Sequence, residues 1–252
     1  MGDLAARRQK QEYVAAQKSV AALLLSFFFA PTPTLAATSW GGSIGVTSDY
    51  LVRGISRSSH SGALQSDLHI AFDNGVIGGV FASATQFATD DHRDVELSAL
   101  VGFAWSGSSP WRAKILASHY SYPWSDAGSN YNYDEINVDA SFREWLDFSV
   151  MYSPNSPRFL RHTGLIGVTE KSAEVNFRTP WRHGLAGTAG VGYSEVSGPA
   201  GTGYAYWSAG AVYDLAPWSF SLSYVNSSAA ARYLFYNAAA RDRWAATVIW
   251  QF

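Results

Sequence analysis

Apolar and polar residues alternate along most of this chain with a period of two. The alternation recurs in segments of roughly ten residues, and almost no stretch has the spacing of an amphipathic helix. A period of two places successive side chains on opposite faces of an extended strand. The pattern predicts twelve β-strands, at residues 43–53, 62–72, 76–87, 94–105, 111–121, 132–143, 145–153, 170–179, 184–195, 203–214, 217–226 and 242–252.

The segment at 94–105 has the clearest division into two faces. One face carries Val95, Leu97, Ala99, Val101, Phe103 and Trp105, and the other carries Asp94, Glu96, Ser98, Leu100, Gly102 and Ala104. Segment 132–143 separates Ile136, Val138, Ala140 and Phe142 from Glu135, Asn137, Asp139, Ser141 and Arg143 in the same way. Each strand therefore presents one apolar and one hydrophilic surface.

Short and long connections alternate between the predicted strands. Asn74-Gly75 is the strongest hairpin signal among the short ones, which lie at 73–75, 106–110, 144, 180–184 and 215–217. The long ones lie at 54–61, 88–93, 122–131, 154–169, 196–202 and 227–241. Short and long connections are thus expected at opposite ends of an antiparallel, up-and-down sheet.

Two architectures use such strands: a soluble sandwich or barrel with the apolar faces inside, and a membrane barrel with the apolar faces toward lipid. Charged groups in mid-strand favour the second, because a dry core would hold them only at a large desolvation cost. These groups are Asp67, His69, Glu96, Lys114, Asp139 and Glu174. We therefore predict an all-β protein: a single transmembrane antiparallel barrel of twelve strands, in the cell outer membrane, with short periplasmic turns and longer outer loops.

Composition agrees with this prediction. Charged residues make up 15% of the chain, below the ~25% of an ordinary soluble domain, and aromatic residues make up another 15%. Aromatic residues gather near strand ends, as in the girdles at membrane interfaces. They include Trp105, Trp111, Tyr122, Trp124, Trp145, Tyr152, Trp181, Tyr193, Trp218, Trp244, Trp250 and Phe252.

The N-terminus has the three-part layout of a secretory signal peptide. Basic residues precede the apolar run "SVAALLLSFFFA" at 19–30, and small residues follow in "PTPTLAA". We expect a cleaved signal peptide at 1–36 and the barrel at 37–252. Twin-arginine export through Arg7-Arg8, or a leader helix that stays attached, are the alternatives.

The chain ends on the strand "RWAATVIWQF", whose Trp250 and Phe252 share the apolar face. The last strand of a barrel must pair with the first, because an open edge in hydrocarbon leaves backbone groups unsatisfied. The stretch also resembles the C-terminal signal that outer-membrane barrels present to the barrel assembly machinery, so we expect that machinery as a partner. A sandwich strand that happens to end the chain is the alternative.

The stretch "GVTSDYLVRGISRS" at 45–58 resembles the opening of the TorF family of predicted porins, also catalogued as Gcw_chp. The resemblance is carried by Ser48, Asp49, Tyr50, Arg53, Gly54 and Ser56. It is clearest over 43–85, and it departs at Arg57, where Gln is common. It implies an outer-membrane barrel of poorly defined transport function and no catalytic residues.

The hydrophilic faces would line the lumen of such a barrel. The predicted lumen residues are Asp49, Arg53, Asp67, His69, Glu96, Arg112, Lys114, Asp139, Arg143, Asp147, Glu174 and Arg178. For Asp49 and Arg53, ion pairs with neighbouring strands are favoured over solute selection. Both charge signs are present and twelve strands enclose a narrow lumen, so we expect a porin-like channel for diffusion or uptake of small solutes, with small conductance and weak ion selectivity.

A lipid-modifying enzyme is the first alternative. His119 and Ser121 face outward at the outer end of a predicted strand, where an imidazole could activate a hydroxyl toward lipid. No outward Asn, Asp or Glu on the neighbouring strands obviously orients the imidazole, so we favour a polar strand end in the headgroup zone and predict no enzyme. The second alternative is a non-conducting structural or adhesin barrel that acts through loops 154–169 and 227–241.

Other chemistry is not indicated. The chain has no Cys, and its six His residues lack the spacing of metal ligands, so we predict neither a metal site nor a cofactor. A formal charge of −2 gives no basic patch for nucleic acid. Outer-membrane lipid and lipopolysaccharide are expected partners; Arg158, Arg161, Arg232, Arg241 and Arg243 could contact lipopolysaccharide, although ordinary solvated loops are an equal alternative.

Overall fold

The computed structural model describes residues 38–86, 93–106, 110–125, 131–143, 145–160, 164–180, 183–197, 202–235 and 239–252. The predicted signal peptide at 1–36 and the aromatic residue Trp181 lie outside these ranges, so both stay predictions. Side chains at 158–166 are also outside the description, which leaves Arg158 and Arg161 undecided as lipopolysaccharide contacts.

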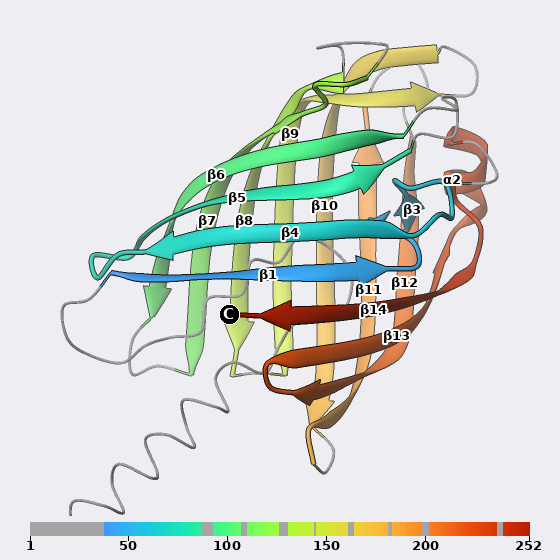
Figure 1. Cartoon of the computed structure of the whole chain (residues 1–252). Helices are drawn as coiled ribbons and strands as arrows, with labels where there is room; N and C mark the ends of the chain where they lie inside the picture. Colours follow the sequence, from blue (N-terminus) through green and yellow to red (C-terminus); the bar gives the residue numbers. More distant parts are fainter. Residues whose placement is uncertain are drawn as a thin grey trace, which may run out of the picture.

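Twelve antiparallel strands close into one barrel (Figure 1). Each strand pairs with its neighbours in chain order, and β1 closes the ring by pairing with both β14 and β4. The wall strands are β1 (Ser39–Thr47), β4 (Ala63–Ala71), β5 (Val76–Thr85), β6 (Asp94–Ser106), β7 (Trp111–Ser121), β8 (Tyr133–Phe142), β9 (Leu146–Leu160), β10 (Gly164–Pro180), β11 (Leu185–Val196), β12 (Thr202–Leu215), β13 (Trp218–Ser227) and β14 (Arg243–Gln251). The predicted up-and-down barrel of twelve strands is confirmed.

The apolar faces of the strands point away from the barrel axis. Val101 is 59% exposed, Val138 47% and Val150 57%, whereas a sandwich would bury these side chains in its core. The alternating inner positions are polar or buried. An outward apolar surface on a closed sheet is the arrangement of a barrel in lipid, so the sandwich alternative is wrong. Within the described ranges, no helix is long and apolar enough to cross a bilayer.

The terminal residue takes part in closing the barrel. The Phe252 N–H donates to the Gly42 carbonyl and the Gly42 N–H donates to the Phe252 carbonyl, both at 3.0 Å. The Phe252 ring lies 6.4 Å from the ring of Trp40 and 5.0 Å from that of Trp250. The two hydrogen bonds satisfy backbone groups that would find no partner in lipid. The role of Trp250 and Phe252 as an assembly signal stays a prediction.

Aromatic residues cluster at the end of the barrel that carries the short turns. Trp111 lies 4.9 Å from Phe142 between ring centroids, and Trp145 lies 5.9 Å from Phe177. Exposed indoles of this kind suit a membrane–water interface, where one edge of the ring meets lipid and the N–H meets water.

The first strand ends earlier than the sequence predicts. A single strand is expected over 43–53, but β1 ends at Thr47 and the chain then leaves the wall. The Thr47 hydroxyl donates to the Asp49 carbonyl at 2.9 Å, and the Ser48 N–H still donates to Ala246 of β14 at 2.8 Å. The alternation in "SDYLVR" belongs instead to a separate segment inside the barrel.

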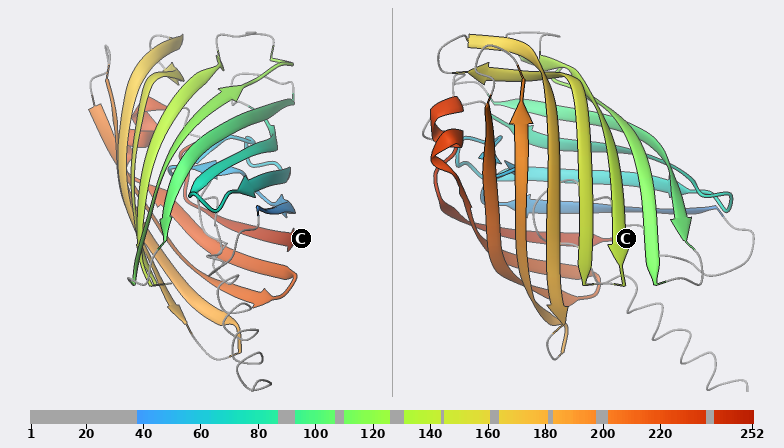
Figure 2. Two further views of the ribbon diagram at one scale, coloured as in Figure 1. Left: turned by 90° about the vertical axis from the view of Figure 1, so that its left-hand side faces the viewer. Right: turned by 180° about the vertical axis from the view of Figure 1, so that it is seen from behind.

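Two outer connections also differ from the prediction. Most of the loop predicted at 154–169 is strand, because β9 continues to Leu160 and β10 begins at Gly164, with a register shift between Val168 and Glu170. The ends of these two strands reach beyond their neighbours (Figures 1 and 2). The connection predicted at 227–241 contains the short helix α2 (Ala229–Leu234). Neither segment has the apolar alternation that marks a strand in lipid, which explains why both are read from sequence as loops.

Candidate functional site

Residues 48–62 fold into the lumen as a small hairpin, which we call the inner hairpin. Its two strands are β2 (Leu51–Val52) and β3 (Ile55–Ser56), which pair only with each other. Arg53 and Gly54 form the turn between them with φ angles of 51° and 75°. A turn with two positive φ values matches the twist of a two-residue hairpin.

Glycine is required at position 54 for space as well as for backbone angle. A Cβ atom there would lie 2.7 Å from the Cβ of Tyr206 on β12. Elsewhere on the inner hairpin, Tyr50 and Val52 pack with Ala63, and Leu51 packs with Val225 and Ala245. The hairpin therefore contacts the wall on several sides of the lumen.

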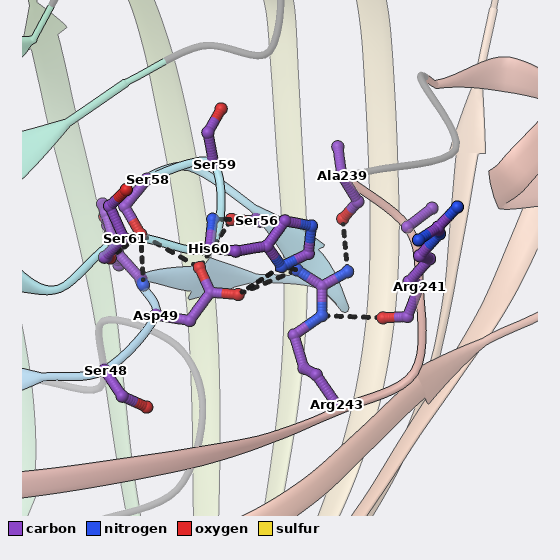
Figure 3. Close-up of polar contacts among 12 residues, drawn as sticks. Ser48, Asp49, Ser56, Ser58, Ser59, His60, Ser61, Ala239, Arg241 and Arg243 are labelled. Atoms are coloured by element: carbon purple, nitrogen blue, oxygen red, sulfur yellow. Dashed lines mark hydrogen bonds and ion pairs between the residues drawn. The ribbon is translucent and has the colours of Figure 1, made fainter.

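The Asp49 carboxylate accepts hydrogen bonds where the inner hairpin leaves β1 (Figure 3). Its Oδ1 accepts hydrogen bonds from the Ser56 hydroxyl at 2.5 Å and the Ser58 hydroxyl at 2.9 Å, and its Oδ2 accepts one from Arg243 Nη1 at 2.8 Å. His60 Nδ1 lies 3.4 Å from the same Oδ2. The Asp49 carboxylate is only 5% exposed, so these partners replace its water.

Arg243, at the start of β14, connects the hairpin to the segment before that strand. Its Nε donates to the Arg241 carbonyl at 2.7 Å and its Nη2 donates to the Ala239 carbonyl at 2.9 Å (Figure 3). With its side chain 8% exposed and directed at Asp49, Arg243 is a structural partner of the hairpin. The lipopolysaccharide contact considered from sequence does not fit this placement, because the guanidinium is turned inward.

Arg53 spans the lumen from the tip of the hairpin. Its Nη2 donates to Glu135 Oε1 of β8 at 2.9 Å, and its Nη1 lies 3.6 Å from Glu170 Oε1 of β10. Glu170 is fully buried and accepts from the hydroxyls of Ser156 at 2.9 Å and Ser194 at 2.8 Å. One guanidinium thus joins two wall strands that are distant in sequence from the hairpin.

Arg57 makes a second link between the inner hairpin and the wall, toward β6 and the tyrosines Tyr122 and Tyr133. Its Nη1 donates to the Tyr122 hydroxyl at 2.9 Å and lies 3.7 Å from Glu96 Oε2 of β6. Glu96 is fully buried and also accepts from the hydroxyls of Tyr50, at 2.7 Å, and Tyr122. The Arg57 guanidinium lies 5.7 Å from the centre of the Tyr133 ring.

The helix α2 packs at the same end of the barrel as the inner hairpin (Figure 1). Leu234 and Phe235 are buried against Tyr204 and Tyr206 of β12, with the Phe235 ring 5.3 Å from that of Tyr204. Ile55 of the inner hairpin packs against this group. Figure 1 places α2 and β3 at the same end of the barrel. The hairpin and the helix therefore pack against the same part of β12.

The lumen away from the inner hairpin is also lined by paired charges. Lys114 Nζ lies 3.6 Å from Asp139 Oδ2, His69 Nδ1 lies 2.8 Å from Asp67 Oδ1, and Arg178 donates to Asp214. The first pair joins neighbouring strands, the second lies on β4, and the third reaches from β10 past β11 to β12. The wall is therefore charged toward the interior.

The structure places the residues predicted to line the lumen as follows. Asp67, His69, Glu96, Arg112, Lys114, Asp139, Asp147, Glu174 and Arg178 lie on strands, at inner positions. Asp49 and Arg53 lie inside the barrel, but on the inner hairpin instead of the wall. Arg143 differs, because it is exposed in the turn after β8, at φ 54°, with its guanidinium 5.4 Å from the Phe142 ring centre.

Four residues of the network are not among the predicted lumen residues. Glu135 and Glu170 form ion pairs with Arg53, and Asp214 forms one with Arg178. Arg57 donates a hydrogen bond to the Tyr122 hydroxyl. Alternation identifies Glu135 as an inner position, but nothing in it indicates a partner. Glu170 is the first residue of the predicted strand 170–179, and the alternation does not predict that it is buried.

A second polar group lies on the outer surface. His119 Nδ1 on β7 lies 2.8 Å from Asp134 Oδ1, its direct cross-strand partner on β8. Asn155 Nδ2 donates to Asp134 Oδ2 at 3.0 Å. The expectation that no outward acid lies near His119 is wrong, because the register between β7 and β8 places Asp134 opposite the imidazole.

Comparisons with solved structures show the fold. The NanC porin is 10% identical over 84% of this chain and 98% of its own, with a TM-score of 0.52. The KdgM porin is 11% identical over 85% of this chain and 99% of its own, with a TM-score of 0.49. LpxR from Salmonella typhimurium is 10% identical over 84% of this chain and 99% of its own, with a TM-score of 0.43. With the lipid-facing surface, this fold makes the chain an outer-membrane β-barrel.

Sequence comparison gives a family and no activity. None of the curated proteins matches the sequence. One family model matches residues 33–252, which cover the whole barrel and nearly all of the chain, and it is described as a bacterial protein family of unknown function. The inner hairpin and all of its wall partners therefore lie inside the matched region, and this chain belongs to the Gcw_chp family.

Proposed function

We propose that this barrel is a narrow channel for the diffusion or uptake of small solutes, with the inner hairpin as its constriction. The observation that supports the proposal is the hairpin itself. It lies across a lumen whose wall carries charged and hydroxyl groups, and its arginines bind carboxylates on β6, β8 and β10. The resemblance to TorF predicted porins agrees with this function. Residues 1–36 would direct export before cleavage.

Planar-bilayer recording tests the channel. The protein is first shown to be folded by heat-modifiable migration on a denaturing gel. We expect discrete conductance steps that are smaller than those of open 16–18-stranded porins, because twelve strands enclose a narrower lumen and the hairpin fills part of it. Absence of channel events from folded protein would contradict the proposal and favour a structural or adhesin barrel.

A second candidate function is ester hydrolysis at the lipid-facing surface. Ser121 lies two positions after His119 on the outer face of β7, and Asp134 holds the imidazole at Nδ1. A hydroxyl, an imidazole and an acid that orients the imidazole are the parts of a serine nucleophile. The Ser121 hydroxyl donates to the Leu97 carbonyl at 3.4 Å, so it must leave this partner to attack.

Release of fatty acid from phospholipid vesicles tests this activity. We expect Ser121→Ala and His119→Asn to abolish release, while Ser118→Ala, an inward position on the same strand, leaves it unchanged. The hydrolase is contradicted if the wild-type protein releases no more fatty acid than vesicles without protein.

A further inference from the structure

Three charged side chains of the inner hairpin bind partners on the barrel wall. Arg53 binds carboxylates on β8 and β10, Arg57 binds a carboxylate on β6, and Asp49 binds an arginine on β14. Arg53 and Arg57 are 6% and 5% exposed, whereas the His60 side chain beside Asp49 is 38% exposed. The attachment of the hairpin to β14 therefore includes a titratable group that solvent reaches.

His60 Nδ1 lies beside both groups that make this attachment (Figure 3). It is 3.4 Å from Asp49 Oδ2 and 3.2 Å from Arg243 Nη1, and those two atoms are 2.8 Å apart. A guanidinium nitrogen can only donate, so Nδ1 of the neutral imidazole accepts from Arg243. The neutral histidine thus supports the contact that joins the hairpin to β14.

Protonation of His60 changes Nδ1 from an acceptor into a donor. The new N–H faces the donor nitrogen of Arg243 at 3.2 Å, and both groups are then positively charged. Nδ1 can donate to Asp49 Oδ2, which Arg243 already binds, while Ser56 and Ser58 occupy Oδ1. Two cations then share one buried oxygen and repel each other, so the contact between Asp49 and Arg243 weakens.

Other charges on the adjoining elements do not remove this repulsion. Arg241 precedes β14 and adds positive charge to the same segment. Asp242 has the opposite sign, but it is exposed and its carboxylate accepts the Tyr224 hydroxyl at 2.8 Å. Arg57, on the hairpin itself, is directed at a carboxylate on β6. The charge change at the imidazole therefore acts mainly on the contact between the hairpin and β14.

From this geometry we propose that protonation of His60 in acid releases the inner hairpin from β14 and widens the channel. Histidine is the side chain that ordinarily changes charge between about pH 5 and 8. The buried ion pairs of the two hairpin arginines persist, so the hairpin leans away from β14 without leaving the lumen. The apolar contact of Leu51 with Val225 and Ala245 then opens. The inference rests on the proposed channel function, because it names the regulation of the constriction.

Planar-bilayer recording at about pH 8 and about pH 5 tests this response. We expect the mean conductance of the wild type to be several-fold higher in acid. His60→Asn should keep its neutral conductance in acid, because asparagine offers an acceptor, tolerates the φ of 64° at this position and does not titrate. His183→Asn makes the same exchange at a φ of 58°, in the exposed turn before β11, and should keep the acid response. Heat-modifiable migration checks folding at both pH values.

Cysteine labelling follows the movement of the hairpin without an electrical readout. The chain has no Cys, so Leu51→Cys introduces a single thiol at a position that is 6% exposed. Its maleimide labelling rate is divided by that of Ala229→Cys, an exposed position, at the same pH, because the thiolate fraction falls in acid. We expect this ratio to rise about tenfold or more between about pH 8 and about pH 5, and to stay constant when His60→Asn is added.

The two measurements separate the acid response from the channel itself. Faster labelling in acid without channel events supports the movement and overturns the channel. Channel events whose conductance, like the labelling ratio, is equal at both pH values overturn the inference and leave the channel standing. An acid response that His60→Asn retains also overturns the inference, because another group then carries the titration.

Discussion

Replacing residues 50–57 of the inner hairpin by a short glycine-serine linker is expected to raise single-channel conductance several-fold. The hairpin lies inside the lumen and contributes no strand to the barrel wall. Thr47 and Ala63 are direct partners in the pairing of β1 with β4, so a linker can join these strands without a change in register. Water would enter the space that the hairpin leaves and hydrate Glu96, Glu135 and Glu170.

The matched control exchanges residues 88–91, which lie in a connection predicted from the sequence, for the same linker. We expect its conductance to stay at the wild-type value. Both variants are checked for folding by heat-modifiable migration before recording. Equal conductance of the hairpin variant and the wild type would show that the narrowest part of the lumen lies elsewhere.

Arg53→Met is expected to destabilise the barrel by about 3–5 kcal/mol, because removing one partner of a buried ion pair leaves an uncompensated charge. Arg53 is 6% exposed, Glu135 4% and Glu170 0%. Methionine fills much of the volume of the arginine but donates no hydrogen bond, so the two carboxylates lose a cation without gaining water. The measurement is the free energy of unfolding in urea, with the protein in lipid vesicles.

Arg241→Met provides the control for this substitution, since Arg241 is exposed near the same end of the barrel. Its effect should stay within about 0.5 kcal/mol. Combining Arg53→Met with Glu135→Gln should recover part of the lost stability, because residues in one ion-pair network are coupled. A loss below about 1 kcal/mol in Arg53→Met would mean that water reaches the carboxylates and that the hairpin is held mainly by its apolar contacts.

The strands of the wall could be read from the sequence because lipid imposes a strict rule on them. Every strand in the bilayer must turn one face to hydrocarbon, and this produces the alternation at Val95 to Trp105 or at Ile136 to Phe142. The bounds predicted for 111–121 agree with β7 at both ends. The outer parts of β9 and β10 lack this alternation, so the sequence predicts loops there.

The candidate site could be read only in part. Alternation assigns Glu96, Asp139 and Glu174 to inner positions, but it cannot say which charge meets which. Arg53 and Glu135 are 82 positions apart, and His119 and Asp134 meet because of the register between two strands. Register depends on turn geometry and on the whole wall, so a one-residue slip would replace every such partner.

The order of residues along the chain is enough to predict a twelve-stranded barrel with an apolar outer surface, since period-two alternation and the lengths of the connections are local features. The entry of residues 48–62 into the lumen depends on contacts between distant parts of the chain. In sequence, "SDYLVR" reads as the continuation of a strand. Arg53, Arg57 and Asp49 acquire partners on β6, β8, β10 and β14 only when the barrel closes, and these buried ion pairs hold the segment inside.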